Sequence, residues 1–153
     1  MKKLILMSIL IFASLTTSAQ SLNETMDFIG ANLNNYAYSK EFSTKCTNNA
    51  LEMPTANFAS DNSRKNYTKV FMKHIKSVNY SIGASDTRII TIVGQCFLFE
   101  FEKLVVDQVE PQSISILLLP TTPIENVNRI IKAIKHAAEL EGAELINDDL
   151  FKD

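Results

Sequence analysis

Two segments with helical periodicity bracket a series of segments with strand periodicity, and this order narrows the folds open to the chain. Near the N-terminus, apolar residues recur every three or four positions from Leu22 to Tyr36, as they do on one face of a helix. The same spacing runs from Val127 to Ala138 near the C-terminus. Between them lie runs rich in β-branched and aromatic residues, which are typical of strands. The order predicts an α+β domain rather than alternating βαβ units.

Capping signals mark the ends of both predicted helices. The run Ser21–Glu24 has the spacing of a capping box, with a hydroxyl at the N-cap and a glutamate three residues later. The run Thr122–Glu125 repeats it, with Thr122 as the N-cap and Pro123 at the first helical position. Gly142 stands where a left-handed residue would end the second helix. Each helix is expected to lie against a core through its apolar face.

Five or six segments between the helices have the composition or the alternation of strands. They are residues 40–46, 70–78, 89–93, 95–101, 104–109 and 114–119. Their spacing favours hairpins and an antiparallel sheet, in which the apolar run 114–119 is expected to be a central strand. Residues 47–66 lack periodicity and are rich in Asn, with Pro54 and Asp61 among them. They predict a long loop, functional or mobile, with room for a short strand or helical turn.

The element order from Phe42 to Gly142 resembles that of pleckstrin-homology-like domains, in which a C-terminal amphipathic helix closes a curved antiparallel sheet. This resemblance implies that the second helix packs on the sheet. The chain departs from that architecture by a helix before the sheet, and by five or six strand segments where the fold has seven. A cystatin-like sheet wrapped around the first helix is the alternative.

The first nineteen residues have the pattern of a secretory signal peptide. A pair of lysines precedes the uncharged apolar run Leu4–Leu15, and small residues follow it. Because Thr17 and Ala19 suit the cleavage site, we expect the mature chain to begin at Gln20. The short, lysine-led leader resembles those of bacteria, and the chain as a whole resembles small exported bacterial proteins of unassigned function.

The same segment bears on localisation and domain organisation. Twelve apolar residues would cover about 18 Å as a helix, short of the roughly 30 Å hydrocarbon core of a bilayer. We therefore expect a periplasmic or secreted protein with no transmembrane segment after signal removal. Residues 20–142 are predicted to form a single domain, and residues 143–153 an acidic tail.

Composition and motifs exclude several functional classes. The formal net charge of −2 argues against a dedicated nucleic-acid binder. The chain has no His-Glu-x-x-His, Gly-x-Ser-x-Gly, Cys-x-x-Cys, phosphate-loop or EF-hand motif. We accordingly predict no catalytic residue, no metal site and no cofactor, and a partner that is a protein or a small ligand.

Cys46 and Cys96 are the only cysteines of the chain, and three interpretations stand for them. An exported protein meets an oxidising compartment, in which the two can form a disulfide. Alternatively, both are buried thiols that act as small apolar residues. In the third interpretation, one of them is the nucleophile of an enzyme with His74 or His136 as its base. His136 is predicted to face solvent, because it lies opposite the apolar face of the second helix.

Five basic residues fall in a stretch without acidic residues between positions 61 and 86, and we call them the basic patch. They are Arg64, Lys65, Lys69, Lys73 and Lys76. Such a patch suits an anionic lipid headgroup, a glycan or an acidic partner. The favoured alternative is a solvated edge strand, on which lysines prevent pairing between sheets.

Three phenylalanines at a period of two, Phe97, Phe99 and Phe101, form what we call the aromatic ladder. If all three were open, they would expose an apolar patch near the limit of about 300–600 Å² for soluble monomers. We therefore expect Phe99 to be buried and the ladder to belong to the core, with any ligand site near residues 47–66.

These observations favour an exported, non-enzymatic domain that binds a protein or a small ligand through its sheet or its long loop. The alternatives are a small exported enzyme that depends on cysteine and histidine, and a structural component of an envelope assembly.

Overall fold

The computed structural model describes residues 21–40, 43–54, 66–100, 103–107 and 111–146. The predicted signal peptide therefore lies outside the described residues. So do Arg64 and Lys65 of the basic patch, Phe101 of the aromatic ladder, and residues 147–153 of the predicted tail.

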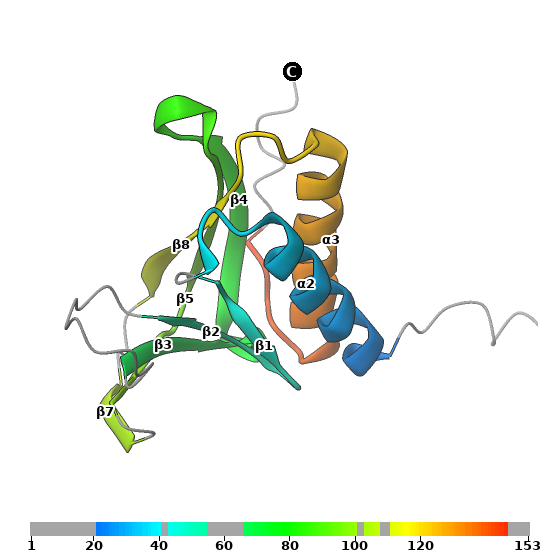
Figure 1. The fold of residues 1–153 in the computed structure, drawn as a ribbon. Helices are drawn as coiled ribbons and strands as arrows, with labels where there is room; N and C mark the ends of the chain where they lie inside the picture. Colours follow the sequence, from blue (N-terminus) through cyan, green and yellow to red (C-terminus); the bar gives the residue numbers. More distant parts are fainter. Residues whose placement is uncertain (1–20, 41–42, 55–65, 101–102, 108–110, 147–153) are drawn as a thin grey trace, which may run out of the picture.

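The fold is α+β, as predicted, with helices on one side of two antiparallel sheets (Figure 1). The helices are α2 (Leu22–Tyr36) and α3 (Ile124–Leu140). The five-stranded sheet has the order β1-β2-β3-β6-β7, and the three-stranded sheet the order β4-β5-β8. The strands are β1 (Lys45–Thr47), β2 (Ala50–Pro54), β3 (Asn66–Phe71), β4 (Ile75–Ile82), β5 (Arg88–Gly94), β6 (Phe97–Glu100), β7 (Lys103–Asp107) and β8 (Gln112–Leu118).

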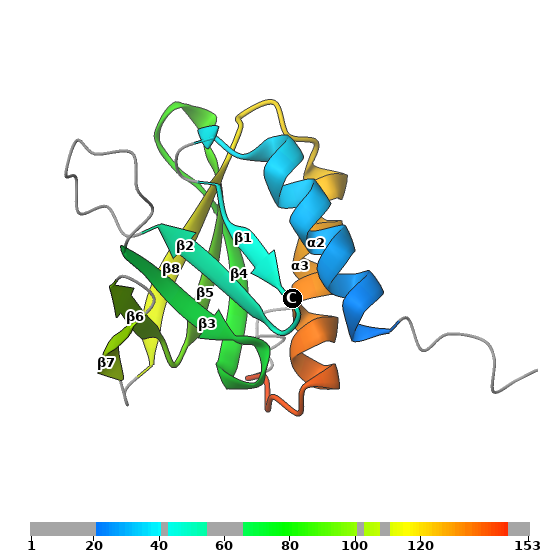
Figure 2. The same ribbon diagram turned by 60° about the horizontal axis from the view of Figure 1, so that its bottom comes forward.

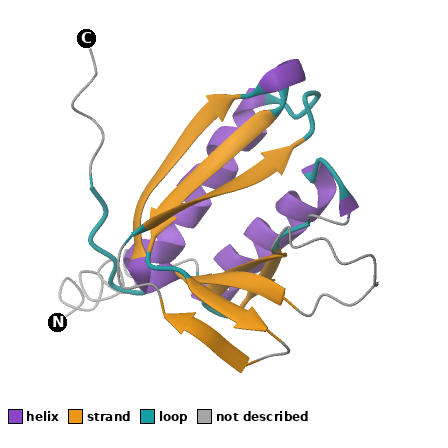
Figure 3. Cartoon of the chain, turned by 90° about the vertical axis from the view of Figure 1, so that its left-hand side faces the viewer, coloured by secondary structure: helices purple, strands orange, loops and turns teal. Residues whose placement is uncertain are grey.

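The division into two sheets differs from the expected single sheet of five or six strands, and it arises at two adjacent corners of the chain. The segment predicted as one strand over 70–78 is broken by a 3₁₀ turn, η2 (Met72–His74), and β4 then begins in the other sheet. At the second corner, between β5 and β6, the Gln95 amide donates to the His74 carbonyl at 3.2 Å. A Cβ on Gly94 would lie 2.6 Å from that carbonyl oxygen, so only glycine permits this approach. Figure 3 shows the two sheets at an angle to each other.

One strand realises an alternative that the sequence left open, and another lies elsewhere in its sheet than expected. Strand β2 lies inside the predicted loop 47–66, where it pairs with β1 and β3 and buries Leu51 and Met53. Strand β8, expected to be central, is the outer strand beside β5. Its outer edge is bonded by the segment after α2, because the Tyr38 amide donates to the Leu117 carbonyl at 3.0 Å.

The core lies between the helices and the sheets, and it confirms both predicted apolar faces. Helix α2 contributes Met26, Ile29 and Leu33. Helix α3 contributes Val127, Ile130, Ile134, Ala137 and Ala138. The two helices lie side by side in both Figure 1 and Figure 2. Neither helix has the length and hydropathy that a membrane crossing requires, within the described part of the chain.

Of the two predicted capping boxes, one forms. The Ser21 amide donates to a Glu24 carboxylate oxygen at 2.9 Å, and the Glu24 amide donates to the Ser21 hydroxyl at 3.2 Å. The box predicted at Thr122 is wrong, because the N-cap of α3 is Pro123 and no side chain caps this helix. Thr122 is instead buried, and its hydroxyl has no hydrogen-bond partner. Gly142 ends the helix with a φ of +82°, as expected.

The first residues of the predicted acidic tail are bound to the domain. After Gly142, the Ala143 amide donates to the Ala138 carbonyl at 2.9 Å. The chain then runs beside β4, where the Ile146 amide donates to the Lys76 carbonyl at 2.8 Å. Ala143 and Leu145 pack against the core.

Candidate functional site

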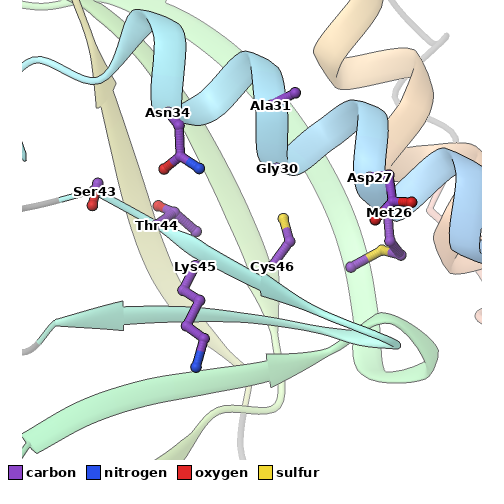
Figure 4. A pocket seen from close by; sticks show the side chains of 9 residues that line it. All are labelled: Met26, Asp27, Gly30, Ala31, Asn34, Ser43, Thr44, Lys45 and Cys46. Carbon is purple, nitrogen blue, oxygen red and sulfur yellow. The ribbon is translucent and has the colours of Figure 1, made fainter.

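The sequence directs attention first to Cys46, which lies on β1 beneath helix α2. It lines a pocket of about 360 Å³ with residues of both elements (Figure 4). Burial, and then the negative charge of Asp27, raise the pKa of the Cys46 thiol to about 12. Since the thiolate is the reactive species, this cysteine is a poor nucleophile at neutral pH.

The shape of this pocket follows from close packing between α2 and β1. A Cβ on Gly30 would lie 3.3 Å from the Cβ of Cys46, so the glycine lets the helix approach the strand. In Figure 4 the side chain of Lys45 points away from the helix. Its ammonium lies 3.9 Å from a Glu52 carboxylate oxygen on the neighbouring strand. The lysine charge is therefore directed away from Cys46, and the pocket lacks a convergent group that would activate the thiol.

Cys96 is the second candidate, and it is buried at the corner between β5 and β6. Its thiol donates to the Gly94 carbonyl at 3.6 Å, and burial raises its pKa. Both cysteines are free thiols in the structure. Among the described residues, no group of three histidine, cysteine, aspartate or glutamate side chains is arranged to hold a metal ion.

The described members of the basic patch do not share one environment. The Lys69 ammonium lies 3.0 Å from a Glu52 carboxylate oxygen, and it also sits over the rings of Phe71 and Phe99, at 5.1 and 5.9 Å. Lys73 and Lys76 are exposed, on η2 and β4. The charge of Lys69 is therefore compensated within the five-stranded sheet.

The prediction that the aromatic ladder is core is wrong for its described members. Phe97 and Phe99 are half-buried on the face of the five-stranded sheet away from the helices. The register places Phe99 opposite Tyr67, and the two rings stack at 5.1 Å with an interplanar angle of 3°. Phe97 packs edge-on against Phe71 at 5.3 Å and lies 5.7 Å from the His74 ring. The aromatic rings thus cover one another without a helix above them.

A second pocket, of about 340 Å³, lies between the two helices, and we call it the helix groove. It is lined by Thr25, Phe28, Arg129, Lys132, Ala133 and His136. The guanidinium of Arg129 lies over the Phe28 ring, 5.4 Å from its centre. One end of the helix pair is fixed by Asn126, whose side-chain amide donates to the Tyr36 hydroxyl at 2.5 Å.

The helix groove is positively charged. Arg129, Lys132 and His136 stand three and four residues apart, so they lie along one face of α3. Among the residues that the structure describes, no acidic side chain lines the groove. In the described ranges, the ion pairs of the protein involve Glu52 and none of these three groups. A concave site with cationic groups such as Arg129 and Lys132 attracts anions.

A buried hydroxyl without a partner adds a second sign of a ligand. Thr25 is only 2% exposed, and its hydroxyl makes no hydrogen bond. Leaving such a group unsatisfied costs about 1–3 kcal/mol. A polar atom of a ligand in the groove would remove that cost.

The sequence did not predict this site, since it placed His136 toward solvent. The helical wheel of α3 identifies one apolar face and leaves the flanks undetermined. In the structure, α2 packs along one flank, and His136 is half-buried there. The spacing of Arg129, Lys132 and His136, facing the pair Thr25 and Phe28, was the available signal, but it becomes meaningful only once the helices are known to be neighbours.

Comparison of the chain with protein-family models, curated proteins and solved structures found no match.

Proposed function

We propose that the protein is an exported, non-enzymatic binding module that takes a small anionic ligand in the helix groove. The observation that carries this proposal is the meeting of two cationic side chains, Arg129 and Lys132, with His136 and the unpartnered Thr25 hydroxyl in one pocket. Export rests on the signal-peptide pattern of residues 1–19.

The size and lining of the groove support a small ligand. Pockets for small molecules are concave, mostly apolar and typically about 300–1,000 Å³ in volume, with a few polar groups that orient the ligand. The helix groove has a volume of about 340 Å³ and combines Phe28 and Ala133 with four polar side chains. Its charge selects an anion although the whole chain is slightly acidic, with a net charge of −2.

The state of the two thiols favours binding over the alternative of a cysteine-dependent enzyme. The pKa values of Cys46 and Cys96 are both raised by burial, so each thiol is protonated at neutral pH. Catalytic cysteines have lowered pKa values and an accessible sulfur. A binding role requires neither property.

The test is calorimetric titration of the mature protein with benzoate and with phenyl phosphate at low salt. Both anions are expected to bind at one site. Arg129→Gln should weaken each by about tenfold or more, since it removes a hydrogen bond to a charged group. Lys135→Gln is the matched control, because it removes a charge from the same helix outside the groove. Absence of binding by both anions, or equal losses in the two variants, would overturn the proposal.

A further inference from the structure

We infer that the helix groove binds an elongated organic anion in one direction, with its anionic head beside Arg129 and Lys132 and a second polar group beside Thr25. This inference rests on the proposed function and specifies its ligand class. Two small anions, carboxylate and phosphate, share the chemistry of the head.

The relative direction of the helices places the polar groups at different ends of the groove. The Tyr36–Asn126 hydrogen bond joins the end of α2 to the start of α3, so the helices run antiparallel. Thr25 lies eleven residues before Tyr36, and this brings it level with the part of α3 near His136. Phe28 lies beside Arg129, closer to the joined end. The groove therefore has an Arg129 end and a Thr25 end.

The volume of the groove exceeds that of a compact ion. The groove holds about 340 Å³, within the range of pockets for small organic molecules. A single phosphate ion beside Arg129 would leave the rest of the groove unfilled. A ligand that uses both ends needs a spacer between its two polar groups.

The lining between the ends is apolar, so the spacer is expected to be apolar. Phe28 and Ala133 line this part of the groove. An aromatic ring or a short alkyl chain would bury its surface there, and such burial contributes about 25 cal/mol per Å².

The Arg129 end is organised to hold a planar or tetrahedral anion. Contact with the Phe28 ring occupies one face of the guanidinium. Its N–H groups lie in the guanidinium plane, and they can donate a pair of parallel hydrogen bonds to a carboxylate or phosphate. Lys132, one helical turn from Arg129, adds a second positive charge.

The experiment compares benzoate with 4-hydroxybenzoate, which share a carboxylate head and an aromatic spacer and differ in the hydroxyl at the far end. We expect 4-hydroxybenzoate to bind the wild-type protein about tenfold more tightly, because its hydroxyl completes the hydrogen bonding of Thr25. In Thr25→Val this advantage should disappear, so that the two probes bind with equal affinity. Thr25→Ser, which keeps the hydroxyl, should retain the advantage.

The outcomes separate this inference from the proposed function. If both probes bind the wild-type protein equally, or if Thr25→Val keeps the preference, the inference fails and the groove remains an anion site. If neither probe binds, the proposed function fails. Thermal unfolding of each variant reports whether the fold is intact. Neutral 4-hydroxybenzyl alcohol should bind at least tenfold more weakly than 4-hydroxybenzoate, and equal binding would refute the anionic head.

Discussion

The guanidinium carbon of Arg129 lies 5.4 Å from the centre of the Phe28 ring, so a cation of one helix rests on an aromatic face of the other. This contact orients the arginine at the mouth of a pocket that has no carboxylate in its lining. Orientation by a ring leaves the charge uncompensated, whereas orientation by a carboxylate would cancel it. The pair therefore fixes the position of Arg129 and keeps it available to an anion.

Replacing the ring by an aliphatic side chain tests this role. Phe28→Leu should weaken benzoate binding by about two- to fivefold, since a cation–π contact at a partly exposed site contributes about 0.5–1 kcal/mol. Calorimetry measures the affinity. Phe28→Tyr, which keeps the aromatic face, should bind benzoate as the wild type does, and a comparable loss in that variant would contradict the assignment.

Ser21 precedes α2 and Thr122 precedes α3, and the two residues should respond differently to loss of their hydroxyls. Ser21→Ala removes a cap that forms, so it should lower the free energy of unfolding by about 1 kcal/mol. Thr122→Val removes a buried hydroxyl that has no partner, so the free energy of unfolding should stay the same or rise. Urea unfolding of the two variants provides the comparison. A loss at Thr122 equal to that at Ser21 would show that the hydroxyl does cap α3.

Cys46 should make folding stability depend on alkaline pH. Its native pKa is about 12 against an ordinary value of 9.0, because burial and Asp27 disfavour the thiolate. The contribution of the protonated native thiol is fully present below pH 9, and it is lost as the pH rises toward 12. The loss should reach at most about 1.4 kcal/mol per pH unit.

The comparison is urea unfolding of wild type and Cys46→Ala at pH 8 and pH 10. The two proteins differ only at position 46, so the difference between the two pH dependences isolates Cys46. An identical pH dependence in the two proteins would show that the native thiol titrates at its ordinary pKa. Native Cys46 should also react slowly with a thiol reagent at pH 8, since it remains protonated.

Alanine substitutions at Gly94 and at Gly83 provide a matched comparison that tests the close backbone approach at the corner between the sheets. A Cβ at Gly94 would lie 2.6 Å from the His74 carbonyl oxygen, and a Cβ at Gly83 would lie at the same distance from the terminal carbon of Ile89. Backbone cannot move as a side-chain end can, so Gly94→Ala should cost about 1–3 kcal/mol by overpacking. Gly83→Ala should cost clearly less. The measurement is the free energy of unfolding of each variant. Equal losses would mean that the backbone at the corner can shift to accommodate the added Cβ.

Local features of the chain were predictable because their causes are local. The helix from Leu22 to Tyr36 has its predicted bounds, since an apolar stripe and a capping box act within a few residues. The α+β class follows from the order of such segments. Most core-facing positions on α2 and α3 could be predicted for the same reason, although Thr25 and Ala137 are buried without having been predicted.

Features that depend on distant parts of the chain were not predictable. Phe99 was assigned to the core because its strand alone does not indicate which sheet face the helices cover. The break at η2 depends on a hydrogen bond from Met72 to Asn49, which belongs to another hairpin. The helix groove combines residues about a hundred positions apart, such as Thr25 and Arg129, and no spacing within one helix reveals it.

The short extended segments that follow the helices have a consequence for self-association. One bonds to Leu117 at the outer edge of β8, and the other bonds to Lys76 at the outer edge of β4. At the edge of the five-stranded sheet, the register between β6 and β7 shifts and leaves Val105 without an opposite residue. Covered edges and irregular edges are two of the ways in which sheet proteins avoid joining edge to edge. The chain uses both, so a strand from another molecule added at β4, β7 or β8 would first have to displace part of the domain itself or straighten an irregular strand.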